Sequence, residues 1–290
     1  MKIIPLAFDS LGVRSVATFV ETDDVNILID GGCALGPRRY SLPPHPLEWK
    51  KLEELSEIII SHAMIADVLI ISHYHYDHYF PAEPEIFKGK IALVKHPEEK
   101  INKSQYNRSH DFLPRIESIV KKLEYADNKN FKFGKTKLKF SPPVWHGKKG
   151  TKLGYVIMVS IDDGKERFIH GSDAQGPVED KTTEWIISED PDILFQDGVA
   201  TLFLGWRESP KLLEYGNKNC IKILEQTKVK KMVLDHHIVR DLKYKEKIRP
   251  VLEKAKELGK EFITAAEFAG LKPNFLEARR KELYQKNTLE

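Results

Sequence analysis

The chain has 290 residues, and its 46 Lys and Arg residues nearly balance 43 Asp and Glu residues, which leaves a formal net charge of +3. This balance argues against a polycationic protein that coats nucleic acid and against an acidic disordered chain. Hydrophobic residues make up 41% of the sequence, enough for a sizeable core, and two cysteines cannot build a disulfide framework. The charged fraction of 31%, rich in Lys and Glu, is typical of a thermophile.

The N-terminal sequence, MKIIPLAFDSLG, lacks the long apolar segment of a signal peptide. No apolar run reaches the roughly 18 residues that a membrane span requires. We therefore expect a cytoplasmic protein without a membrane partner.

The first quarter of the chain predicts short strands, then a loop and a helix. Strands are expected over 2–8, 14–21 and 25–30, an ordered loop over 31–46 and a helix over 47–61. The continuous apolar run VLIIS at 68–72 is typical of a buried strand.

Beyond this strand the sequence predicts helices that alternate with strands. Helices are expected over 98–124 (interrupted near Pro114), 210–226, 243–258 and 273–286. Strands are expected over 131–133, 136–140, 154–161, 167–170, 193–196 and 231–235. No repeat or low-complexity linker divides the chain, so we expect one α/β domain over residues 1–290, with paired sheets and outer helices.

A dense group of metal-ligating residue types follows the apolar run at 68–72. Residues 73–78 read HYHYDH, and an extended backbone places His73, His75 and Asp77 on one side. Neutral imidazoles and a carboxylate are ligands that zinc, iron and manganese accept. The alternative is a histidine-rich surface turn, in which these groups would repel one another when protonated.

This segment resembles the signature of the metallo-β-lactamase superfamily, and further motifs follow in the order of that family. Asp30 matches the first motif, in which an aspartate supports the metal site through hydrogen bonds. His146 matches the third motif and Asp173 the fourth, whereas the fifth falls at His236 or His237. The resemblance implies a four-layer αββα fold, with two mixed sheets sandwiched between helices.

The resemblance also implies a site for two divalent metal ions, zinc in the first place, with manganese and iron as alternatives. The ligands expected from the motifs are His73, His75 and His146 for one ion, Asp77, His78 and His236 for the other, and Asp173 between them. His236 is favoured over His237 by its place after the last strand. Because neighbouring residues on a strand face opposite ways, His237 is left to contact substrate. Asp77 is expected to orient a nucleophilic hydroxide that bridges the two ions.

Four further residues are candidates for supporting the ligands or binding substrate. Arg38 and Arg39 lie in the loop at 31–46, at the expected mouth of the site, and are suited to an anionic substrate. Solvated surface charge is the alternative for both. His170 and Asp197 stand at strand ends, where each either supports a ligand or has a purely structural role.

Together these features favour a metal-dependent hydrolase, similar to archaeal-type members of the superfamily. The two arginines favour an anionic ester as substrate, such as a phosphodiester or nucleic acid. One alternative is a thioester hydrolase of the glyoxalase II kind, and another is an oxidoreductase that resembles mononuclear iron persulfide dioxygenases. A metal-binding scaffold without catalysis is the third.

Overall fold

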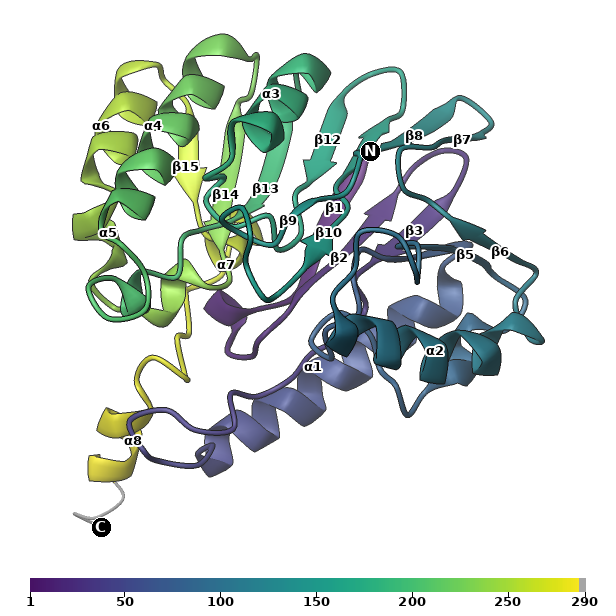
Figure 1. Ribbon diagram of the computed structural model, residues 1–290, viewed down its shortest axis with the longest axis horizontal. Helices are drawn as coiled ribbons and strands as arrows, with labels where there is room; N and C mark the ends of the chain where they lie inside the picture. Colours follow the sequence, from purple (N-terminus) through teal and green to yellow (C-terminus); the bar gives the residue numbers. More distant parts are fainter. Residues whose placement is uncertain (287–290) are drawn as a thin grey trace.

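The computed structural model describes residues 1–286 and contains two mixed β-sheets with helices on their outer sides (Figure 1). The four-layer α/β arrangement expected from the motifs is thereby confirmed. Within the described residues, no helix combines the length and apolarity needed to cross a membrane.

The first sheet has six strands in sequence order. They are β1 (Lys2–Phe8), β2 (Val16–Glu21), β3 (Asn26–Ile29), β4 (Val68–Ile71), β5 (Ile91–Val94) and β6 (Lys122–Tyr125). Strand β2 is antiparallel to both β1 and β3, whereas β3 to β6 run parallel to one another. Parallel strands end at the same edge of a sheet, so the residues that follow β3 and β4 meet there.

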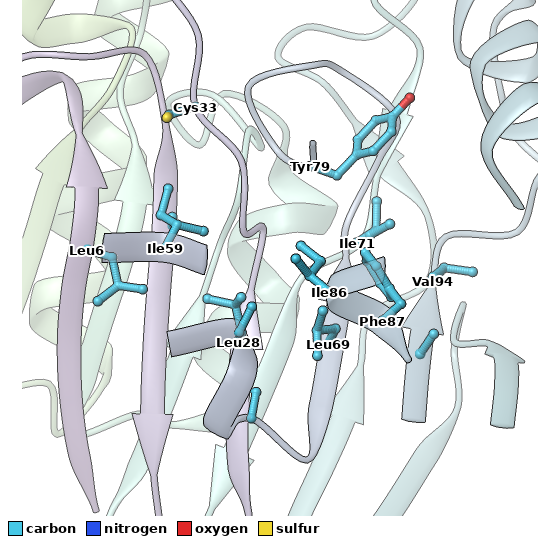
Figure 2. Packing of buried hydrophobic residues seen from close by; sticks show 14 of the residues in the cluster. Leu6, Leu28, Cys33, Ile59, Leu69, Ile71, Tyr79, Ile86, Phe87 and Val94 are labelled. Atoms are coloured by element: carbon cyan, nitrogen blue, oxygen red, sulfur yellow. The ribbon is translucent and has the colours of Figure 1, made fainter. Parts of the chain in front are cut away.

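Helices α1 (Pro46–Ile65) and α2 (Lys103–Glu117) cover the outer face of this sheet. Figure 2 shows Ile59 of α1 beside Leu6 and Leu28, which point out from the sheet. A capping box starts α1, because the His45 ring accepts a hydrogen bond from the backbone NH of Leu47 and Glu48 accepts one from the backbone of His45.

The second sheet has the strand order β15-β14-β13-β12-β11-β8-β7. Its strands are β7 (Asn130–Phe133), β8 (Thr136–Phe140), β11 (Val159–Asp162), β12 (Arg167–His170), β13 (Ile193–Asp197), β14 (Lys231–Asp235) and β15 (Glu261–Ile263). A separate pair consists of β9 (Val144–Trp145) and β10 (Tyr155–Val156). Strands β12 to β15 are parallel, which brings their carboxyl ends to one edge.

Helices α3 (Asp180–Glu189), α4 (Lys211–Gln226) and α6 (Arg249–Glu257) pack on the outer face of the second sheet (Figure 1). The short helices are α5 (Tyr244–Lys247), α7 (Ala265–Phe268) and α8 (Arg280–Lys286). Single 3-10 turns are η1 (Asp9–Leu11), η2 (Pro84–Phe87), η3 (Thr201–Phe203) and η4 (Ile238–Arg240).

A third apolar cluster fills the space between the two sheets. The ring of Phe195 on β13 lies 5.9 Å from that of Phe8 on β1 and 5.0 Å from that of Phe168 on β12. Burying a side chain of this size contributes about 1.5–3 kcal/mol. This packing holds the ends of strands from both sheets against each other.

Several predicted elements differ from the structure. The helix expected over 98–124 was wrong beyond Glu117, because residues 122–125 pair with β5 as strand β6. The helix expected over 273–286 is reduced to α8, and the NH of Asn274 instead donates to the carbonyl of Ser10. In both segments a distant pairing partner outweighs local helix propensity. The sequence analysis also missed β5, β6, α3 and β15.

Candidate metal centre

Side chains that can ligate metal gather where strands from both sheets end. Residues 73–78 follow β4, His146 follows β9, Asp173 follows β12 and His236 follows β14. These segments lie far apart in the sequence. Although these strands belong to different sheets, they end close together, so the side chains that follow them meet at one place.

Three residues at these strand ends have the left-handed backbone conformation that favours glycine. Asp30, Ser172 and His236 have φ values of 50°, 46° and 63°. Such a conformation costs a non-glycine residue of the order of 1 kcal/mol and is common at functional sites. It turns the chain sharply at the end of β3, β12 and β14, at the edge where the ligands meet.

The first group of ligands consists of His73, His75, His146 and Asp173, with one ligand atom of each within 4.8 Å of the others. His73 Nε2 lies 2.9 Å from His75 Nδ1. His146 Nε2 lies 3.0 Å from Asp173 Oδ2. The four donors therefore lie close enough together to hold one ion.

The second group consists of Asp77, His78 and His236, whose ligand atoms also lie within 4.8 Å of one another. Asp173 contacts this group through its other oxygen, since Oδ1 lies 3.3 Å from His78 Nε2 and 3.5 Å from His236 Nε2. One buried carboxylate thus presents one oxygen to each group of ligands.

The donor atoms are suited to cations because several have no other partner. Among the described residues, both ring nitrogens of His146, Nε2 of His78 and Oδ1 of Asp173 are buried without a hydrogen bond. A buried polar atom left in this state costs about 1–3 kcal/mol. Burial lowers the pKa of His75 to about 3, helped by the neighbouring His146, so its imidazole is neutral and able to ligate.

The carboxylates of the site raise the pKa values of two neighbouring histidines. Burial lowers the pKa of His236, but the charges of Asp173 and Asp9 outweigh it and raise that pKa to about 10. Burial likewise opposes protonation of His78, whose pKa is nevertheless raised well above its ordinary value by Asp173 and Asp30. Both shifts reflect the negative charge gathered at the site, which a bound cation would balance.

Asp30 lies beneath the ligands and organises them through hydrogen bonds, as expected from the first motif. Its Oδ1 accepts a bond from the backbone NH of Ser72 (2.8 Å), and its Oδ2 accepts bonds from the hydroxyls of Ser72 (2.7 Å) and Ser172 (2.9 Å). His78 Nδ1 lies 3.0 Å from Asp30 Oδ2. The sequence analysis missed both serines, although each directly precedes a predicted ligand.

Asp9 and Arg240 form a second supporting contact that the sequence analysis missed. Asp9 Oδ2 lies 2.7 Å from His236 Nδ1, and Asp9 Oδ1 accepts a 2.7 Å hydrogen bond from Arg240 Nε. A carboxylate on the far nitrogen of a ligand histidine fixes its tautomer and raises its basicity. The sequence contains only a weak indication of this role. Asp9 directly follows a strand, as Asp30 does, but it lies in no recognised motif.

His236 and His237 do not face opposite ways, contrary to the expectation from strand alternation. Both lie within 4.8 Å of Asp173 through a ligand atom, because the left-handed conformation of His236 interrupts the extended backbone. Of the two, His236 belongs to the group with Asp77 and His78. His237 Nδ1 is instead 2.7 Å from Asp197 Oδ2, and its ring centroid is 5.8 Å from that of His146. Asp197 therefore supports His237 rather than forming a plain turn.

The remaining predicted residues lie outside the ligand cluster. His170 Nε2 lies 2.9 Å from the carbonyl oxygen of Val16, so its ring faces the neighbouring sheet, which favours the structural one of its two expected roles. Arg38 is exposed, and Arg39 donates a 2.9 Å hydrogen bond to the carbonyl of Arg240. This bond ties the loop at 31–46 to the segment that follows His236.

Comparison with known proteins agrees with this geometry. The profile of the Metallo-beta-lactamase superfamily matches residues 11–261. A UPF0282 protein of Methanocaldococcus jannaschii is 47% identical over 98% of this chain and 97% of its own length, and one of Pyrococcus abyssi is 46% identical over 98% and 93%.

Solved structures show the same fold at low sequence identity. Unliganded yeast PDE1 superposes with a TM-score of 0.52 at 13% identity, over 90% of this chain and 96% of that chain. An isothiocyanate hydrolase from Delia radicum gut bacteria gives a TM-score of 0.50 at 13% identity, over 91% and 95%.

Proposed function

Because this chain belongs to the metallo-beta-lactamase superfamily, we propose that it is a metal-dependent hydrolase that binds two divalent ions and cleaves an anionic phosphodiester. The observation that carries this proposal is the position of Asp173. Its two oxygens face separate groups of ligands, one with three histidines and one with Asp77, His78 and His236. A carboxylate shared in this way supports a pair of ions rather than a single one.

Seven residues would hold the ions: His73, His75, Asp77, His78, His146, Asp173 and His236. Bound divalent ions would supply Lewis-acid activation of water and of the scissile ester, with zinc the first candidate for histidine and carboxylate ligands. The protein would contribute the positions of the donors and the tautomers fixed by Asp9 and Asp30.

Asp77 is our candidate for orienting the nucleophile. Its side chain keeps 18% of its surface exposed, whereas those of His78 and His236 are fully buried, so Asp77 faces the solvent side of the group. Burial raises its pKa, but His78 and His236 lower it to about 2. The ionised carboxylate can therefore accept a hydrogen bond from the attacking water at neutral pH.

The charge around the site favours an anionic substrate over a neutral one. Arg38 and Arg39 lie on the loop after Asp30, and Lys149 and Lys152 on the loop after His146; Arg38 and both lysines are exposed. Guanidinium and ammonium groups bind phosphate oxygens through charge-assisted hydrogen bonds. A phosphodiester supplies such oxygens next to the bond to be cleaved.

Turnover of three substrates by metal-loaded protein tests the proposal. We expect release of nitrophenolate from methyl p-nitrophenyl phosphate, and at least a hundredfold lower rate constant in Asp77→Ala. Asp111→Ala, which removes an exposed carboxylate on α2, is the matched control. Exclusive turnover of a glutathione thioester, or oxygen consumption with glutathione persulfide, would replace the phosphodiesterase proposal by one of the alternative activities.

A further inference from the structure

Arginine side chains stack on aromatic rings at three places in the described part of the chain. The guanidinium of Arg108 lies 4.2 Å from the ring centre of Tyr76. That of Arg207 lies 4.2 Å from the ring centre of Trp206, and that of Arg39 lies 4.5 Å from the ring centre of Tyr40. The three rings are large and exposed, at 48% for Tyr40, 48% for Tyr76 and 71% for Trp206.

The first of these pairs belongs to the metal-ligating segment itself. Tyr76 stands between His75 and Asp77, and its ring is exposed although the neighbouring ligands are largely buried. Arg108 reaches it from α2 and also donates a 3.1 Å hydrogen bond to the carbonyl of Tyr74. The pair is therefore held next to His75 and Asp77.

The second pair is held beside the loop that follows His146. A hydrogen bond of 2.8 Å from the NH of Gly205 to the carbonyl of Glu208 closes the turn that presents Trp206. The carboxylate of Glu208 pairs at 2.6 Å with Lys148, two residues after His146. This ion pair holds the Trp206 turn beside the loop that follows His146.

The third pair is attached to the segment after His236. Arg39 donates to the carbonyl of Arg240, whose side chain binds the Asp9 carboxylate behind His236. The hydroxyl of Tyr40 donates to the carbonyl of Ala278 at 3.1 Å. Three exposed rings on separate loops are thus each paired with an arginine, and each of these loops either contains metal-ligating residues or is bonded to a segment next to them.

Scattered exposed aromatic residues need no explanation, but this arrangement does. An arginine behind a ring restrains the orientation of that ring and adds positive charge, while the opposite face remains available to a second flat group. Nucleobases stack on such rings, and their phosphates bind the accompanying cations. A thioester of glutathione has no flat ring that could stack on these aromatic side chains.

From this arrangement we infer that the rim, defined here as the pairs Tyr40–Arg39, Tyr76–Arg108 and Trp206–Arg207, binds nucleobases. The substrate is then a phosphodiester that carries nucleobases, either a small nucleotide or a single strand of nucleic acid. This inference rests on the proposed function for the reaction, but the rim contacts can be measured without turnover.

The test compares two ligands that differ in their bases alone. Metal-loaded protein is titrated into fluorescein-labelled oligothymidylate or an abasic strand of the same length, both with hydrolysis-resistant phosphorothioate linkages. We expect the base-bearing strand to bind at least about fivefold more tightly, the lower end of the stacking contribution of one base. Equal affinity for the two strands would overturn the inference.

Variants of the rim assign the preference to its rings. Trp206→Ala should remove most of the base preference, whereas Trp206→Phe should keep most of it. Trp49→Ala is the matched control, because this tryptophan is 56% exposed on α1, outside the rim. A base preference that survives Trp206→Ala, Tyr40→Ala and Arg108→Ala together would also overturn the inference.

Two further readouts separate the rim from the chemistry. Trp206→Ala should leave the kcat for methyl p-nitrophenyl phosphate within about twofold of wild type, since this probe carries no nucleobase. Wild-type protein that turns over this probe but binds the two strands equally refutes the rim alone, whereas base-selective binding without any turnover refutes the proposed reaction alone. Competition by a thymidine dinucleotide as strong as that of the longer strand would identify a small nucleotide, and weaker competition a strand; both support the inference.

Discussion

The carboxylate of Asp9 lies 2.7 Å from Nδ1 of His236, although 227 positions separate the two residues in the sequence. Asp9 is in the first turn after β1, and His236 follows β14 in the other sheet. The contact therefore joins the two halves of the sandwich at the metal centre. Because Nδ1 is engaged by Asp9, His236 presents Nε2 to Asp77 and Asp173.

Replacing Asp9 by Asn should weaken metal binding in the second group of ligands. The amide oxygen can still accept a hydrogen bond from His236, but the negative charge that raises the basicity of the imidazole is lost. Changes of this kind typically cost 10–100-fold in metal affinity. Calorimetric zinc titration measures the effect, and Asp23→Asn, an exposed acid, is the control. Unchanged affinity for both ions would show that Asp9 has no part in the site.

Asp197→Asn should act on catalysis rather than on metal content. Asp197 holds His237, which lies next to the first ligand group without belonging to it. We expect kcat to fall by about tenfold or more while two ions per chain remain bound. Elemental analysis together with initial rates measures both quantities. Loss of one ion in this variant would instead identify His237 as a ligand.

Removal of metal should lower the melting temperature. Apoprotein keeps several buried donors without partners, so ions bind the folded chain in preference to the unfolded one. Metal at about one hundred times its dissociation constant stabilises a protein by about 2.7 kcal/mol per site. Calorimetry after treatment with EDTA and after zinc restoration measures this shift. His73→Ala should show a smaller shift, and an equal shift in both proteins would place the bound zinc elsewhere.

Arg280 should be essential for stability, in contrast to its neighbour Arg279. The buried guanidinium of Arg280 donates two 2.7 Å hydrogen bonds to the carboxylate of Glu48 and others to the carbonyls of Gly36 and Leu42. Arg280→Ala leaves Glu48 charged and buried without its partner, which typically costs about 3–5 kcal/mol. Arg279→Ala breaks an exposed pair and should change the free energy of unfolding by less than about 1 kcal/mol. Urea denaturation compares the two variants, and equal effects would contradict the prediction.

Glu277 should make stability depend on acid pH. Burial raises its pKa, but the hydrogen bonds of Arg14 and the charge of Arg240 lower it to about 2, against an ordinary value of 4.5. A lowered carboxyl pKa stabilises the folded state above the unfolded pKa, and this stabilisation disappears as pH falls from about 4.5 to about 2.

Glu277→Gln should therefore lower the free energy of unfolding by about 2 kcal/mol at pH 7, after allowance for partial solvent exposure of the pair. The difference from wild type should shrink as pH falls through the same interval. Urea denaturation at a series of pH values measures it, with Glu282→Gln as the exposed control on α8. A difference that does not change with pH would exclude ionisation of Glu277 as its cause.

Local patterns in the sequence predicted the candidate ligands of the HYHYDH segment, and the resemblance to a known family predicted the others. The HYHYDH segment follows a continuous apolar run, so its spacing alone indicates a metal site at the end of a buried strand. The two-sheet class followed from the order of the motifs, and the structure confirms it. Strand β6, by contrast, exists because β5 lies beside it, and no local pattern of residues 122–125 distinguishes it from the end of a helix.

The sequence by itself determined the chemistry of the site, because the identities of its histidines and aspartates decide which ions they can bind. Tertiary structure alone decided which residues support them. Asp9, Ser72 and Ser172 reach the ligands through contacts between distant strand ends, and such contacts leave no periodic trace in the chain. It also decided the positions of His236 and His237, because a left-handed backbone at His236, where β14 ends, leaves both residues close to Asp173.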